Sequence, residues 1–256
     1  MKVTPILFSG PMVCALLREI EKPGTGKTQT RRVLKARRDV NFGCELAPCE
    51  LAGEINQGNF DNSPYAPGDL LWVRETWCEG PIGRDGVVED WRDFFYRATD
   101  HDVMGVDDGD GFSVLNADGS LRSPWRPSIH MPRRASRLTL EVTDVRVERL
   151  QDISEEDALA EGVLKVKDHC YVVRGFGYDE SGLCHSRATI PFAQLWDSLN
   201  EARGAGWDVN PWVVAVTFKV HPVNIDALLE KLTKYAPVRE QGDPAQAPPA
   251  RSDCVA

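Results

Sequence analysis

The stretch PGTGKTQTRR, residues 23–32, ends like a phosphate-binding P-loop, with Gly-Lys-Thr followed by basic residues. The full P-loop motif also needs a glycine five positions before Gly26, and this chain has Glu21 there. The preceding residues, 12–20, have helical rather than strand periodicity. We therefore expect no triphosphate site. The simplest alternative is a helix ended by Pro23 and Gly24 and followed by a solvated basic strand.

Composition is ordinary for a globular protein of one large or two small domains, and the chain has 256 residues. Seven cysteines, an odd number at irregular spacing, indicate reduced thiols rather than a disulfide framework. The first residues lead only into a short apolar run, and no stretch is long enough to span a membrane. We expect a cytoplasmic protein without a signal peptide, of a bacterium or of a phage-infected host.

The basic residues are concentrated locally, although the formal net charge is −9. Residues 27–38 contain six basic side chains and no acidic one. A second group, also free of acids, consists of Arg122, Arg126, Arg133, Arg134 and Arg137. A basic face on an acidic protein suits one anionic or nucleotide-like ligand better than a long polyanion. Two solvated charge runs without a ligand are the alternative.

Hydrophobic patterns predict strands at residues 5–8, 70–77, 138–148 and 212–220, and helices at about 11–21, 155–161, 191–199 and 224–235. Segments rich in Gly, Asn, Asp or Pro predict insertions at about 39–64, 79–123 and 165–188, the first of them a loop. Residues 222–236 contain the last, amphipathic helix, and the tail 237–256 is expected to be disordered. Separated strands with few short helices favour an α+β, barrel-like domain over an alternating β-α-β sheet.

Four segments in order resemble the ASCH domain family, in particular its phage and prophage branch. They are a helix followed by KTQTRR (27–32), PGDLLWVRETW (67–77), WRPSIHMPR (125–133) and ISEEDALAEG (153–162). Each segment alone is a weak signal, but together they are specific, and the resemblance covers about residues 3–221. It implies a PUA-like fold, a small β-barrel with flanking short helices. Domains of this fold commonly bind RNA or modified nucleobases.

Some small bacterial ASCH proteins are N4-acetylcytidine amidohydrolases, and the resemblance transfers their proposed machinery to Lys27, Thr30 and Glu161. Lys27 would accept the proton of Thr30, Thr30 would attack the acyl carbonyl, and Glu161 would protonate the leaving cytosine amine. Burial or a nearby cation would have to lower the pKa of Lys27 for this role. Arg31 and Arg32 are adjacent and are expected to bind substrate. On a regular strand Lys27 and Thr30 would face opposite sides, so a bend is required.

This chain departs from the small ASCH enzymes in its greater length, its insertions and an extended turn at residues 21–25. These departures leave other functions open. The same residues would bind RNA or a modified nucleotide without chemistry, or act as a ribonuclease, or the insertions would form a platform for protein contacts. None of these functions requires a metal or an organic cofactor, and the oligomeric state is not predicted.

A second candidate set of ligand-binding residues lies on the strand after PGD. Glu75 could accept hydrogen bonds from a base edge while Trp77 stacks on it, and Arg74 faces the other way. The alternative is a core tryptophan and a glutamate paired with an arginine. In the Pro-bounded stretch that follows, the candidates for lining the pocket are Ser128, His130 and Arg133.

A zinc site is the remaining alternative for the insertion at 165–188. His169-Cys170 and Cys184-His185 form a mirrored pair of possible ligands. No CxxC motif is present, and adjacent His-Cys ligands are geometrically awkward. We therefore predict no metal among the site residues.

Overall fold

The computed structural model describes residues 1–79, 94–100, 125–173 and 184–235, together with the backbone of four short strands between residues 82 and 122. Its centre is a five-stranded mixed sheet in the order β1-β5-β12-β15-β2. These strands are Val3–Leu7, Leu70–Arg74, Thr139–Arg149, Trp212–His221 and Gln29–Val33. Only β1 and β5 run parallel, and the other neighbours are antiparallel. The predicted tail, 237–256, lies outside the described residues.

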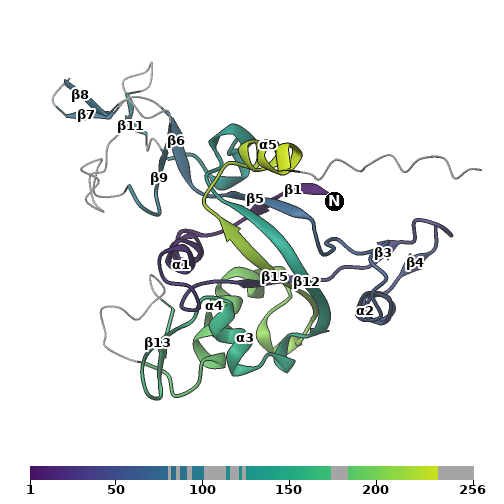
Figure 1. Cartoon of the computed structure of the whole chain (residues 1–256). Coiled ribbons are helices and arrows are strands. Elements are labelled where there is room, and N and C mark those ends of the chain that lie inside the picture. Colours follow the sequence, from purple (N-terminus) through teal and green to yellow (C-terminus); the bar gives the residue numbers. More distant parts are fainter. Residues whose placement is uncertain are drawn as a thin grey trace, which may run out of the picture.

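Five helices surround the sheet (Figure 1). They are α1 Gly10–Glu21, α2 Pro48–Asn56, α3 Glu155–Ala160, α4 Thr189–Asn200 and α5 Ile225–Tyr235. Helix α5 packs beside β1 and β5, whereas α3 and α4 lie at the other end of the sheet, near β2 and β15 (Figure 1). The predicted α+β class is confirmed. In the described part of the chain, β1 and β2 remain the two edges of the sheet and do not pair to close a barrel.

Short two-stranded ribbons extend from this body. They pair β3 (Arg37–Arg38) with β4 (Glu45–Leu46), β6 (Trp77–Glu79) with β9 (Phe94–Tyr96), β7 (Ile82–Arg84) with β8 (Val87–Asp90), β10 (Val114–Leu115) with β11 (Leu121–Arg122), and β13 (Leu164–Lys167) with β14 (Cys170–Val172). The ribbons that include β6 to β11 fall within the insertion predicted at 79–123, or at its edge, and the last falls at the start of the one predicted at 165–188.

The long strand β12 changes its buried face halfway along. Leu140 and Val142 are buried in its first half, and Val145 and Val147 in its second. The register shifts between Val142 and Asp144, so one extra residue reverses the alternation. As a result, residues 146 and 148 both lie opposite the core face in the second half. There Glu148 accepts hydrogen bonds from Arg31 of β2 and from Arg146.

The expectation of a loop over residues 39–64 is wrong for helix α2. This helix buries Leu51, Ala52 and Ile55, which recur at helical spacing, and it packs on β12. Its start is capped because the Glu50 carboxylate accepts a hydrogen bond from Ala47 N at 2.7 Å. The glycines around the helix obscured this pattern, and its apolar face is stabilised by the sheet rather than by local propensity.

Candidate functional site

The segment that carries Lys27 crosses very close to helix α1. Lys27 N donates to Ala15 O at 2.9 Å, and Thr28 N donates to Ala160 O at 2.8 Å. A Cβ atom on Gly26 would lie 2.4 Å from Ala15 O and 2.3 Å from Glu19 N. Only glycine permits this approach, so the chain between Pro23 and β2 is clamped between α1 and the end of α3.

The backbone amides of the P-loop-like turn are occupied by the protein itself. Gly24 N donates to both carboxylate oxygens of Glu19, at 2.9 and 3.0 Å, and Gly26 N donates to one of them at 2.9 Å. A carboxylate of helix α1 thus takes the place that a phosphate would need in a cradle of amides. The geometry agrees with the rejection of a triphosphate site.

Lys27 and Glu161 form a buried ion pair. Lys27 Nζ donates to Glu161 Oε2 at 2.7 Å and to Glu161 O at 2.7 Å, and the two side chains are 1% and 5% exposed. Glu161 is placed by the end of α3 and by Gly162, whose φ of +107° is accessible mainly to glycine. Burial lowers the pKa of Lys27, the Glu161 carboxylate opposes this, and the nearby Arg32 and Arg31 add to the lowering.

Arg31 is buried and fully used by the protein. Its Nε donates to Glu148, its Nη1 to Gln29 and Glu161, and its Nη2 to Glu148 and Asp157. These contacts account for all five N–H donors of a guanidinium. The structure therefore differs from the expectation that Arg31 binds substrate, because Arg31 instead holds the Glu161 carboxylate in place.

The ion-pair network around Arg31 also includes Glu148, Asp157 and a second arginine, Arg146. Arg146 contacts Glu148 at 3.0 Å and also pairs with Asp157. These pairs lower the pKa of Asp157, although its burial acts in the opposite direction. The alternative of a solvated basic strand is therefore wrong at Lys27 and Arg31, whose charges are compensated inside the protein.

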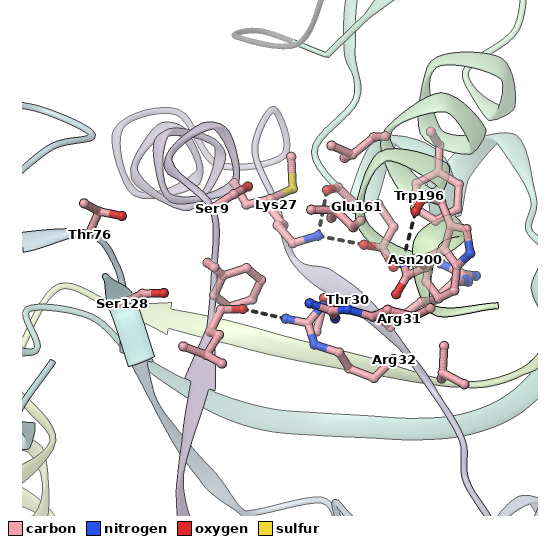
Figure 2. Close-up of a pocket in the computed structure, with 18 residues that line it drawn as sticks. Ser9, Lys27, Thr30, Arg31, Arg32, Thr76, Ser128, Glu161, Trp196 and Asn200 are labelled. Atoms are coloured by element: carbon pink, nitrogen blue, oxygen red, sulfur yellow. Dashed lines mark hydrogen bonds and ion pairs between the residues drawn. The ribbon is translucent and has the colours of Figure 1, made fainter. Parts of the chain in front are cut away.

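A cavity of about 530 Å³ opens beside this ion pair, within the usual size range of small-molecule sites. Figure 2 shows Thr76 and Ser128 at one side of it and Asn200 at the other, with Lys27 between them. The lining side chains are Leu7, Phe8, Ser9, Met12, Lys27, Thr30, Arg31, Arg32, Val33, Thr76, Ser128, Glu161, Phe192, Leu195, Trp196, Leu199, Asn200 and Arg203.

Thr30 contributes an unused hydroxyl to this cavity. Its backbone lies in β2 opposite Val216 of β15. Among the side chains that the structure describes, none hydrogen-bonds to Thr30 Oγ1. Residues three apart on a regular strand point to opposite faces. Strand β2 begins only at Gln29, so Lys27 lies before it, and both Lys27 and Thr30 can line the same cavity.

Several wall residues were not anticipated. Trp196 and Asn200 are four residues apart on helix α4 and both line the cavity, so helical spacing was an available signal. Ser9 is the N-cap residue of helix α1, but its side chain makes no capping hydrogen bond and lines the cavity. Phe8 lies under two cations, with Lys27 Nζ 5.8 Å and the Arg32 guanidinium 5.1 Å from the ring centre.

Glu75, Arg74 and Trp77 do not line this cavity. Glu75 is buried and accepts two hydrogen bonds from Arg137, at 2.8 and 2.9 Å, which is the structural alternative considered for it. Burial raises the pKa of Glu75, and Arg137 opposes that effect. Trp77 is buried against Met131, and Arg74 stacks on Trp72 at 4.8 Å.

The Pro-bounded stretch contributes only one residue to the cavity, Ser128. His130 is exposed and does not line it. Arg133 is paired with Asp226 of helix α5 at 2.6 Å, and Arg134 is paired with Glu79 at 2.5 Å. Most of the second basic group is therefore neutralised by acids from other elements, contrary to a single basic face.

The mirrored Cys/His pairs lie at the β13–β14 ribbon. The Cys170 and Cys184 thiols are hydrogen-bonded, which raises the pKa of Cys170. Tyr171 and His185 pair through their backbones. Among the described residues, no group of three or more His, Cys, Asp or Glu side chains is arranged to hold a metal ion.

None of the described helices combines the length and apolar character that a transmembrane segment requires. Comparisons with models of known families, with curated proteins and with solved structures found no match. The argument for function therefore rests on the geometry around Lys27, Thr30 and Glu161.

Proposed function

We propose that this chain is an ASCH-type amidohydrolase that removes an acyl group from N4 of a cytosine nucleoside or a similar modified base. The proposal includes membership of the ASCH family, in its phage and prophage branch, and a PUA-like, barrel-related arrangement of the sheet. The observation that carries it is the buried Lys27–Glu161 pair at the edge of a cavity into which Thr30 brings a hydroxyl that has no hydrogen-bond partner among the described residues.

The ion pair supports the proposed acid and base roles together. Transfer of one proton from Lys27 Nζ to Glu161 Oε2, across the 2.7 Å hydrogen bond, produces a neutral amine and a neutral carboxylic acid. Burial favours this neutral pair because it disfavours the charged form of Lys27. The amine is then a general base and the acid a general acid, both beside the same cavity.

The reaction proceeds in two balanced steps. Lys27 accepts the proton of Thr30 as Thr30 Oγ1 attacks the acyl carbon, and Glu161 protonates N4 as the C–N bond breaks. This releases the cytosine amine, leaves an acyl ester on Thr30 and restores the ion pair. A second proton transfer within the pair lets Lys27 deprotonate a water that attacks the ester. Glu161 then protonates Thr30 Oγ1, and a carboxylic acid leaves.

The second candidate function is a binding module that recognises RNA or a modified nucleotide without turning it over. Arg31 favours this alternative, because its hydrogen bond to Glu161 Oε1 at 3.2 Å stabilises a carboxylate rather than a carboxylic acid. In that case Glu161 and Lys27 would act as a fixed pair of polar groups in the cavity wall.

Chromatographic measurement of cytidine release from N4-acetylcytidine tests the proposal. The informative pair of variants is Thr30→Val, which keeps the shape and removes the hydroxyl, and Thr30→Ser, which keeps a nucleophile. Thr30→Val loses no hydrogen bond within the described protein, so it is expected to fold. Thr143→Val is the matched control, because Thr143 is exposed on β12, outside the cavity.

We expect release by the native protein and by Thr143→Val, partial activity of Thr30→Ser, and a loss of at least about a thousandfold in Thr30→Val. The amidohydrolase would be ruled out if folded native protein releases no cytidine. Undiminished release by Thr30→Val would reject Thr30 as the nucleophile. Binding of the nucleoside without release would support the binding module.

A further inference from the structure

The cavity has a surplus of positive charge. Four basic side chains line it, against the single acidic side chain of Glu161, although the whole chain has a formal net charge of −9. Two of the four charges are compensated within the protein. Lys27 is paired with Glu161, and Arg31 is surrounded by Glu148, Asp157 and Glu161. The surplus therefore belongs to the other two cations, Arg32 and Arg203.

Arg32 is held firmly but is not neutralised. Its two hydrogen bonds go to main-chain carbonyl oxygens, of Leu7 at 2.9 Å and of Arg31 at 3.2 Å, and its guanidinium lies over the Phe8 ring. A guanidinium has five N–H donors, so most of the donors of Arg32 remain unused. In the described part of the chain it has no salt bridge to a carboxylate.

Arg203 is the second uncompensated cation. It ends the short 3-10 turn Glu201–Arg203, which follows helix α4 directly and lies beyond Asn200. Its side chain is exposed at the cavity, and within the described residues it makes no ion pair or side-chain hydrogen bond. Arg32 comes from β2 and Arg203 from the end of α4, so the two cations approach the cavity from separate elements.

We propose that the cavity takes a base that carries a phosphate, and that Arg32 and Arg203 bind this phosphate. The inference rests on the proposed function and names its substrate class, a nucleotide or a nucleotide unit of a nucleic acid rather than a neutral nucleoside. Guanidinium groups match phosphate oxygens through paired, charge-assisted hydrogen bonds. The Phe8 ring covers one face of the Arg32 guanidinium, which shields that side of its bonds from water and strengthens them.

Titration calorimetry with cytidine and with cytidine 5′-monophosphate tests the phosphate site without relying on hydrolysis. The variants are Arg203→Gln and a matched control, Arg37→Gln, which removes the same charge from an exposed position on β3 outside the cavity. We expect native protein and Arg37→Gln to bind the monophosphate at least roughly tenfold more tightly than cytidine. Arg203→Gln should lose most of that preference.

Equal affinity for the two ligands in the native protein, or an unchanged preference in Arg203→Gln, would overturn the proposal. Because the readout is binding, it is independent of cytidine release from N4-acetylcytidine. Release of cytidine without tighter binding of the monophosphate would support the amidohydrolase and reject the phosphate site. A phosphate preference without release of the acyl group from either N4-acetylcytidine or its 5′-monophosphate would leave the phosphate site in place and reject the amidohydrolase.

The same titration with a single-stranded cytosine oligonucleotide distinguishes a free nucleotide from a polymer. Contact with this one phosphate predicts a slope of about −0.7 for the logarithm of the association constant against the logarithm of salt concentration. Tighter binding of the oligonucleotide with this shallow slope would assign the site to a nucleic-acid strand. Equal or weaker binding of the oligonucleotide than of the monophosphate would assign it to a free nucleotide.

Discussion

Two buried ion pairs in this protein, Lys27–Glu161 and Arg137–Glu75, have similar chemistry and different surroundings. In each, a buried carboxylate accepts hydrogen bonds of 2.7–2.9 Å from a cation distant in sequence. The first pair borders a cavity that also contains the unpartnered hydroxyl of Thr30. The second lies outside that cavity, with the Arg137 guanidinium stacked 4.0 Å from the centre of the Tyr96 ring.

The difference shows that buried charge alone does not identify a functional site. Both Lys27 and Glu75 have pKa values shifted by burial towards their neutral forms. Structural ion pairs produce such shifts as readily as active sites do. What distinguishes the Lys27–Glu161 pair is adjacent space for a ligand and the Thr30 hydroxyl, which no atom of the described residues satisfies.

The largest effect on stability is expected from Lys27→Met. Removal of this ammonium leaves the Glu161 carboxylate buried with only the longer contact to Arg31, so the free energy of unfolding should fall by about 3–5 kcal/mol. Urea denaturation measures the change. The double variant Lys27→Met/Glu161→Leu should recover part of the loss, because it buries no unpaired charge. A loss below about 1 kcal/mol in Lys27→Met would show that water reaches the pair.

Arg137→Met should have a smaller effect on stability and none on chemistry. Arg137 is 24% exposed, so water partly compensates Glu75 when the guanidinium is removed. We expect a loss of about 1–3 kcal/mol in the free energy of unfolding, against less than about 0.5 kcal/mol for the exposed Arg37→Met. The kcat and KM for N4-acetylcytidine should stay within twofold of native. A larger kinetic change would show that Glu75 contributes to the active site, so that the two ion pairs would not differ in function.

The smallest expected effects are changes with pH, which differ between the Lys27–Glu161 and Arg137–Glu75 pairs. The proposed reaction requires the single proton that the Lys27–Glu161 pair shares, and this proton is lost above the pKa of Lys27, which in the folded protein lies below its ordinary 10.5. The rate constant should therefore fall as the pH rises through that lowered pKa, and Glu75→Gln should leave the profile in place. A profile that rises over the same range would contradict the shared-proton mechanism.

The pKa of Glu75 is raised above its ordinary 4.5, so between these values the native state binds more protons than the unfolded state. Its contribution to stability is therefore fully present below pH 4.5 and is lost as the pH rises through the raised pKa. The difference in the free energy of unfolding between native protein and Glu75→Gln should fall with rising pH in that window. Urea denaturation at several pH values measures it, and a rising difference would contradict the assignment.

Local pattern in the sequence was sufficient for most of the main elements. Alternation predicted β12, and helical spacing predicted α1, α3 and α4. The start of α3 is capped by Ser154, whose side chain accepts from Asp157 N at 3.0 Å. Helix α2 was missed because its apolar residues are few and depend on contact with β12. The bulge in β12 was also missed, because it is stabilised only by neighbouring strands.

For the site, the sequence by itself determined that Lys27, Thr30, Arg32, Ser128 and Glu161 were candidates, and the tertiary structure brought all of these to one cavity. The tertiary structure places five other candidates outside this cavity: Arg74, Glu75, Trp77, His130 and Arg133. It also shows that every N–H donor of Arg31 is used within the protein. Sequence pattern reports which side chains share a face of one element. The acid that an arginine meets depends on packing between elements that are distant in the sequence, 130 residues apart for Arg31 and Glu161, and only the folded chain decides that.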